Sequence, residues 1–83
     1  MSNPIKEAYR ELLHKNRFSQ LEAAKALCER IPNCSVSSAK RILNGQTAPR
    51  IHKFIALMKI FNVTIGERRY LEDLYIIHFK GKD

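Results

Sequence analysis

Four side chains suited to binding a nucleic acid stand close together in the middle of the sequence. Val36 and Ser37 are followed after two residues by two cations, Lys40 and Arg41. Hydroxyl and guanidinium groups form hydrogen bonds with base edges, a valine methyl contacts the thymine methyl, and cations attract phosphates. If the segment is a helix, this spacing places all four on one face. The pattern therefore predicts a surface that could bind DNA bases.

The segment has the signals of a short helix. Ser35 can cap the first free amide groups, and Gly45 can take the left-handed conformation that ends a helix. Between them, apolar residues at three- and four-residue spacing, Ala39, Ile42 and Leu43, would face a core. We therefore expect a recognition helix that presents the four side chains above to solvent.

A second helix is predicted directly before this one. Ser19 and Glu22 have the spacing of a capping box, so a helix should begin at about Gln20. On its inner side Ala23 and Ala24 have only methyl groups, which lets another helix approach closely and at a steep angle. Two helices that cross in this way form a helix-turn-helix.

Three more helices are expected. Asn3 and Pro4 should start the first, where Glu11 and Lys15 are spaced to form an ion pair. Thr47 should cap another that begins at about Pro49. Its inner face should consist of apolar residues at helical spacing, namely Ile51, Phe54, Leu57, Met58 and Phe61.

Thr64 and Glu67 repeat the capping box and predict a fifth helix. Residues 74–79 also have the composition of a strand, which remains the alternative. The segment is more apolar than one buried side requires, and surplus apolar surface marks a partner. We therefore expect the chain to form a homodimer through residues 64–83. The residues assigned to that contact are Ile60, Leu74, Ile76, Ile77 and Phe79.

The order of these motifs resembles that of the phage repressor and Cro family, the lambda-repressor-like helix-turn-helix domains. The residues that carry the resemblance are Gln20-Leu21-Glu22-Ala23-Ala24, Asn44-Gly45, Pro49, Ile51, Phe54, Leu57 and Phe61. It covers about residues 5–63. The resemblance implies an all-α, five-helix fold for residues 1–83 as a single domain, and binding to double-stranded DNA.

The resemblance also implies roles for individual residues. Val36, Ser37 and Arg41, with Lys40 beside them, fall on the base-reading positions. The resemblance puts Gln20, Gln46, Thr47 and Arg50 on the DNA backbone. We also expect Ser38 and Arg17 there; Arg17 is well placed for a phosphate, and a free surface cation remains its alternative. The chain departs from the family between the two motif helices, where residues 28–34 are longer than the usual turn with its glycine. We expect the first motif helix to run to Ile31.

The charge distribution favours a polyanionic partner. The formal net charge is +7, and no acidic residue lies between Glu29 and Glu67. The Lys and Arg residues in that interval are Arg30, Lys40, Arg41, Arg50, Lys53 and Lys59. DNA binding through such cations releases counterions and depends on salt.

Catalytic and metal-binding patterns are missing. Cys28 and Cys34 lack zinc spacing, and the three histidines have no Cys or Asp at ligand spacing. We expect two buried thiols, with a redox-sensitive pair as the alternative, and no enzyme, cofactor or small-molecule ligand. The apolar run 54–58 is too short to cross a membrane, so a cytoplasmic protein is expected.

These observations favour a small dimeric repressor that binds an inverted-repeat operator through the major groove. The family resemblance suggests a phage or mobile element as its source. Two alternatives remain open. One is a protein-interaction module, of antitoxin or anti-repressor type, whose DNA binding is secondary. The other is binding to structured RNA, although the chain lacks the exposed aromatic surface usual for single strands.

Overall fold

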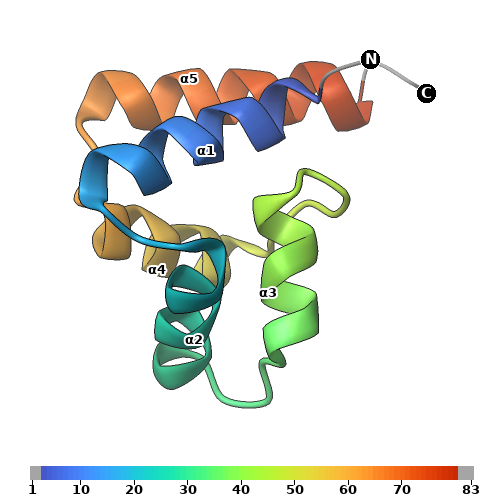
Figure 1. The fold of residues 1–83 in the computed structure, drawn as a ribbon. Coiled ribbons are helices and arrows are strands. Elements are labelled where there is room, and N and C mark those ends of the chain that lie inside the picture. Colours follow the sequence, from blue (N-terminus) through green and yellow to red (C-terminus); the bar gives the residue numbers. More distant parts are fainter. Residues whose placement is uncertain (1–2, 81–83) are drawn as a thin grey trace.

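The computed structural model describes residues 3–80 and contains five α-helices followed by one π-helical segment (Figure 1). The α-helices are α1 (Pro4–Asn16), α2 (Gln20–Arg30), α3 (Val36–Leu43), α4 (Ile51–Phe61) and α5 (Ile65–Tyr75), and the π-helical segment is η1 (Ile76–Lys80). No strand occurs in the described range. The all-α, five-helix prediction is confirmed, and the strand alternative for residues 74–79 is wrong.

Four of the five α-helices begin at a residue whose side chain caps free amide groups. The Asn3 side chain accepts hydrogen bonds from the amides of Ile5 and Lys6. Ser19 and Thr64 each open a complete capping box, with the Glu three residues later bonding back to the cap amide. These three predicted helix starts are confirmed.

The core receives side chains from all five α-helices. Its fully buried members with the largest side chains are Tyr9, Phe61, Ile5, Leu27, Leu43, Leu57 and Leu71. Three alanines, Ala23 and Ala24 of α2 and Ala39 of α3, are also fully buried. Because a methyl group keeps backbones close, α2 and α3 pack directly against each other, as the sequence predicts.

Helix α4 differs from its predicted form at its start. It begins at Ile51, two residues later than expected, and its cap residue Arg50 makes no side-chain cap bond, so Thr47 does not cap it. Ile51 is 68% exposed, and the predicted inner face is wrong at this position. Ala56 is buried instead, because it lies on the same side as Leu57 and the core.

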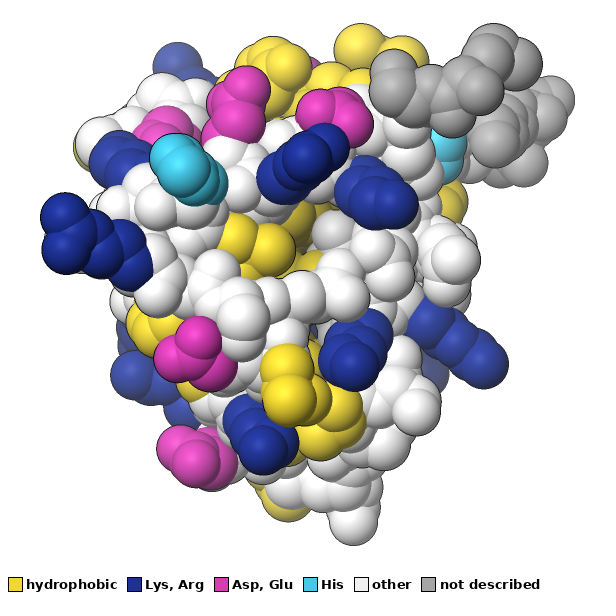
Figure 2. All heavy atoms as spheres, viewed as in Figure 1, with side chains coloured by type: hydrophobic (Ala, Val, Ile, Leu, Met, Phe, Trp, Pro, Cys, Tyr) yellow, Lys and Arg dark blue, Asp and Glu magenta, His cyan; other side chains and the backbone are white. Residues whose placement is uncertain are grey.

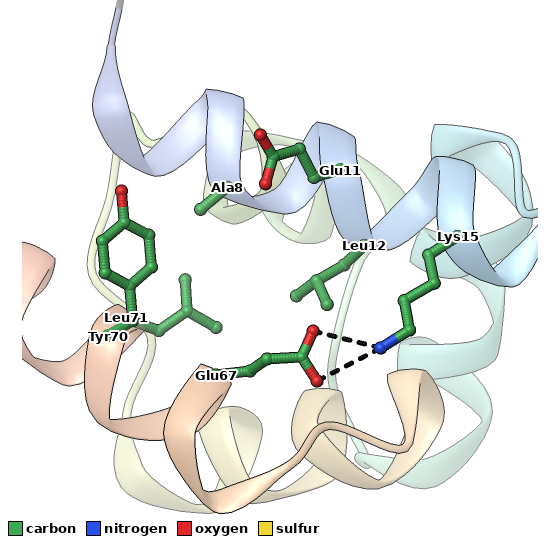
Figure 3. Close-up of a pocket in the computed structure, with 7 residues that line it drawn as sticks. All are labelled: Ala8, Glu11, Leu12, Lys15, Glu67, Tyr70 and Leu71. Carbon is green, nitrogen blue, oxygen red and sulfur yellow. Dashed lines mark hydrogen bonds and ion pairs between the residues drawn. The ribbon is translucent and has the colours of Figure 1, made fainter.

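Helices α1 and α5 lie side by side at the top of the view in Figure 1, and a partly open cavity of about 300 Å³ lies between them. Lys15 turns away from Glu11 and forms an ion pair with Glu67 across this cavity, 3.3 Å between Nζ and Oε2 (Figure 3). The predicted Glu11–Lys15 pair is therefore wrong. The Thr64 amide, which donates to Glu67, lowers the pKa of that carboxyl, and Lys15 adds to this lowering.

The predicted dimerisation residues are not equally available. Ile76 and Ile77 are 55% and 70% exposed. Ile60, Leu74 and Phe79 are half-buried and pack against the core of their own chain, so Ile60 and Phe79 offer less surplus surface than expected, and the dimer contact stays a prediction. The last three residues of the predicted segment 64–83 lie outside the described residues.

A pair of tyrosines joins the two ends of the fold. The Tyr9 side chain in α1 is fully buried, and its hydroxyl is hydrogen-bonded to that of Tyr75 in α5. Burial raises the pKa of Tyr9 well above its ordinary value, and raises the pKa of Tyr75 to about 12. Both hydroxyls therefore stay neutral at physiological pH, and each can act as donor or acceptor.

Tyr75→Phe should destabilise the fold by about 1–3 kcal/mol, because the buried Tyr9 hydroxyl loses its partner. Tyr9→Phe should cost less, since the half-buried Tyr75 hydroxyl can turn to water. The double variant should cost less than the two single changes added together. Urea unfolding of the four proteins measures these differences. Equal costs for the two single changes, with strict additivity, would contradict this account.

Candidate nucleic-acid interface

The link between α2 and α3 sets the position of α3. Helix α2 ends at Arg30, with Ile31 as its C-cap, so the expectation that it includes Ile31 is wrong by one residue. Asn33 then takes a left-handed conformation with φ of 61°, where a shorter link would use glycine. Ser35 starts α3 by accepting a hydrogen bond from the Ser38 amide at 3.1 Å. Asparagine thus makes the turn possible without glycine.

The buried side of α3 determines which residues face outward. Ala39, Ile42 and Leu43 are buried, as the sequence predicts. Ser37 and Arg41 are consequently exposed on the opposite side, whereas Lys40 is half-buried.

Val36 departs from this pattern. Its side chain is half-buried and packs against the core, so the expectation that it faces solvent freely is wrong in part. Ser37 and Arg41 remain the exposed members of the predicted base-reading set, and Lys40 and Val36 are half-buried.

The end of α3 is closed by backbone bonds and by a residue from the start of the chain. The amides of Gly45 and Gln46 bond to the carbonyls of Ile42 and Arg41, the two bonds of a Schellman motif, with Gly45 at φ of 72°. The Asn3 side-chain amide also donates to the Gly45 carbonyl at 3.0 Å. The cap of α1 therefore fixes the loop that follows α3.

A second side-chain bond connects α2 with the end of α3. The Gln20 side-chain amide donates to the Asn44 side-chain oxygen at 2.8 Å. Gln20 is half-buried, and its amide nitrogen carries two N–H donors, of which this bond uses one. The second donor could serve the phosphate contact that the family resemblance implies for Gln20, which stays a prediction.

Beside α3, a shallow cleft of about 180 Å³ gathers cations and hydroxyl groups from three segments. Arg41 and Ser38 come from α3, Thr47 and Arg50 from the loop, and Lys53 from α4. The cleft brings together four predicted site residues and adds Lys53. Lys53 belongs to the basic interval 30–66, but sequence spacing alone does not show that it lies near Arg41.

On the other side of α3, a larger hollow of about 380 Å³ lies between α1, α2 and α3. Leu13 and Leu43 line it together with Gln20 and two cations of α1, Lys6 and Arg10. Figure 2 shows this face, with hydrophobic side chains in a central hollow and Lys and Arg at its border. Lys6 and Arg10 are absent from the predicted site, although their four-residue spacing places them on one face of α1.

The other predicted backbone contacts lie at the ends of helices. Arg17 is the exposed C-cap of α1, with φ of 58°, and it lies three residues before Gln20. Gln46 is exposed in the loop after α3. The predicted backbone contacts thus fall into two groups. Arg17 and Gln20 lie at the α1–α2 connection, and Ser38, Thr47 and Arg50 line the cleft.

Metal-binding sites, membrane-spanning helices and cysteine contacts are three further features that bear on function. Among residues 3–80, no three His, Cys, Asp or Glu side chains come together as metal ligands. In the same range no helix has the length and apolar character needed to span a membrane. Cys28 and Cys34 are half-buried rather than buried as expected, and their sulfur atoms lie 3.4 Å apart.

Comparison with known proteins identifies a family. A family model described as helix-turn-helix matches residues 7–68, most of the chain. Neither curated proteins nor solved structures gave a match.

Gly45→Ala should destabilise the domain by about 1–3 kcal/mol, because it strains a positive φ and displaces the cap of α1. An added Cβ would lie 2.5 Å from the Asn3 side-chain oxygen. Gly66→Ala is the matched control, since its nearest neighbour would be Thr64 Oγ1 at 3.9 Å. This control should be stabilising by about 0.5–1 kcal/mol. Thermal unfolding measures both, and changes of the same sign would contradict the role of Gly45.

Proposed function

Because the chain belongs to the XRE-type helix-turn-helix family, whose members include the lambda repressor and Cro and are DNA-binding transcription regulators, we propose that it is a sequence-specific repressor. It acts in the cytoplasm, without a catalytic role, as a homodimer on an inverted-repeat operator. Occupation of a promoter by the dimer excludes the transcription machinery.

One observation carries this proposal: the outward face of α3 adjoins a cleft lined with cations. Arg41 belongs to both, so a helix inserted into the major groove would bring the cleft against the flanking backbone. Arg50 and Lys53 then lie beside a phosphate while Arg41 reaches a base edge. In this arrangement α3 would contact bases, and the residues of the adjoining cleft would contact phosphates.

Within this proposal each group has a role. Arg41 makes a two-pronged hydrogen bond to guanine, Ser37 and Lys40 bind neighbouring base edges, and Val36 contacts a thymine methyl through its uncovered part. The residues proposed on the sugar-phosphate backbone are Arg17, Gln20, Ser38, Gln46, Thr47 and Arg50. We add Lys53, Lys6 and Arg10 to this proposal because they line the cleft and the hollow beside α3. The Lys and Arg residues of this set supply most of the affinity for DNA.

The proposed dimer uses the apolar surface around the end of α5. A groove of about 390 Å³ lies between the start of α4 and the end of α5, and its lining is mainly apolar. Exposed Ile51 and Ile76 both border it, and exposed Ile77 follows directly. In this proposal a second copy covers this surface, and binding to an inverted repeat requires the dimer to hold its two α3 helices about 34 Å apart, one turn of DNA.

The first experiment is binding of the purified chain to the DNA upstream of its own gene. Small repressors of this kind often control themselves, so this fragment is the best candidate operator. A scrambled duplex of equal length is the control, and both are measured at two salt concentrations. Tight binding to the native fragment alone, weakening with salt, is the expected result. Equal binding to both duplexes would contradict sequence-specific regulation.

Arg41→Ala should reduce affinity for the operator by about 1–3 kcal/mol and relax specificity at one position of each half-site. Arg69→Ala is the matched control, because Arg69 is exposed on α5, outside the two motif helices. This control should retain the specificity of the parent protein. Binding to a panel of single-base operator variants measures the effect. A uniform loss across all variants would make Arg41 a phosphate contact.

Ile77→Asp should convert the dimer to a monomer with little change in the stability of the fold, because Ile77 is 70% exposed. Ile65→Asp, on a side chain 79% exposed at the opposite end of α5, should leave the dimer intact. Sedimentation at several concentrations distinguishes the two. If the parent chain is monomeric at high concentration and on DNA, the groove serves a different protein, as the antitoxin or anti-repressor alternative requires.

A further inference from the structure

The two cysteines of the chain lie at either end of the connection between the motif helices, and their side chains are in contact. Cys28 lies in α2, two residues before its end, and Cys34 lies two residues before α3. Their sulfur atoms are 3.4 Å apart. Both side chains are half-buried, so a small reagent can reach them.

The surrounding structure holds these sulfur atoms near each other. The backbone of Cys28 is fixed by α2, and its side chain packs against the core. Cys34 precedes the cap residue Ser35, whose carbonyl accepts a weak bond from the Cys34 thiol at 3.7 Å. Because the backbone is held at both cysteines, the two thiols lie in contact without a rearrangement of the connecting residues.

We propose that Cys28 and Cys34 are a site of oxidation by peroxide, which joins them in an intrachain disulfide and thereby weakens DNA binding. In the first step one thiol is oxidised to a sulfenic acid, and hydrogen peroxide is reduced to water. In the second step the other sulfur attacks the sulfenic sulfur, the S–S bond forms, and the displaced hydroxyl leaves with the thiol proton as a second water. The two sulfurs together lose two electrons, which the peroxide accepts.

The charges near the pair act in opposite directions. Burial and the contact with Cys34 raise the pKa of the Cys28 thiol, whereas the positive charge of Lys53 lowers it. Lys53 also lines the cleft beside α3. Phosphate bound in that cleft would offset the charge of Lys53, so bound DNA should slow the oxidation.

The effect on DNA follows from the distance that the sulfurs must travel, and this step rests on the proposed function. A disulfide needs about 2.05 Å between its sulfur atoms, so closing the present gap draws the segment before α3 toward α2. Ser37 lies only three residues after Cys34. A displaced first turn of α3 weakens its contacts with base edges, and losing one good contact to a base lowers affinity about tenfold.

The experiment compares the reduced chain with the same chain after hydrogen peroxide treatment and removal of the oxidant. Alkylation followed by mass spectrometry counts free thiols, and operator binding is measured in parallel. We expect the loss of both thiols within one chain, with no covalent dimer, and a roughly tenfold higher Kd. Dithiothreitol should reverse both changes, which distinguishes a disulfide from oxidised methionine.

Cys34→Ser is the control, and it should retain the reduced protein's affinity in peroxide. If that variant does not fold, Cys28→Ala serves the same purpose, because either change removes one sulfur. Two free thiols after treatment, or a disulfide between chains, would overturn the cross-link. A disulfide with unchanged Kd would overturn its effect on DNA. If the reduced chain binds no specific duplex, the repressor proposal fails, while the thiol count still decides the cross-link.

Discussion

Close contact between α2 and α3 is the constraint on which the remaining structure depends. Ala23, Ala24 and Ala39 are fully buried, and their small side chains let the two backbones approach at the crossing. A larger side chain at any of the three would push α3 outward and change what it presents to solvent. The rotation of α3 about its own axis is set on the same side by Ile42 and Leu43. The outward direction of Arg41 is therefore a consequence of packing on the opposite face.

Local signals in the sequence predicted most of the helix boundaries. Ser19, Ser35 and Thr64 start helices where expected, because a side-chain cap acts on amides only two or three residues away. The start of α4 was predicted wrongly from Thr47 and Pro49. There the backbone enters the helix at Arg50 without any side-chain cap, so no capping residue marks the boundary.

The candidate site was less predictable, since it depends on contacts between distant residues. Lys15 pairs with Glu67 rather than with Glu11, because α5 brings a carboxylate across the cavity. Lys53 joins Arg41 at one cleft only after the loop has turned between α3 and α4. The bonds of Asn3 to Gly45 and of Gln20 to Asn44 likewise span long stretches of chain. Periodicity and composition contain no signal for such pairs.

The bond between Gln20 and Asn44 has a further consequence for the proposed complex. It ties the residue expected on a phosphate to the end of the helix expected on the bases, so the distance between those two contacts is nearly fixed. In the proposed complex, a duplex of different groove width would then have to deform to meet both contacts. The free-energy cost of that deformation depends on the base steps of the duplex. Sequences with flexible steps would therefore bind more tightly, even where no side chain contacts those steps. The operator would then be selected partly by its mechanical properties, at base pairs that the protein does not touch.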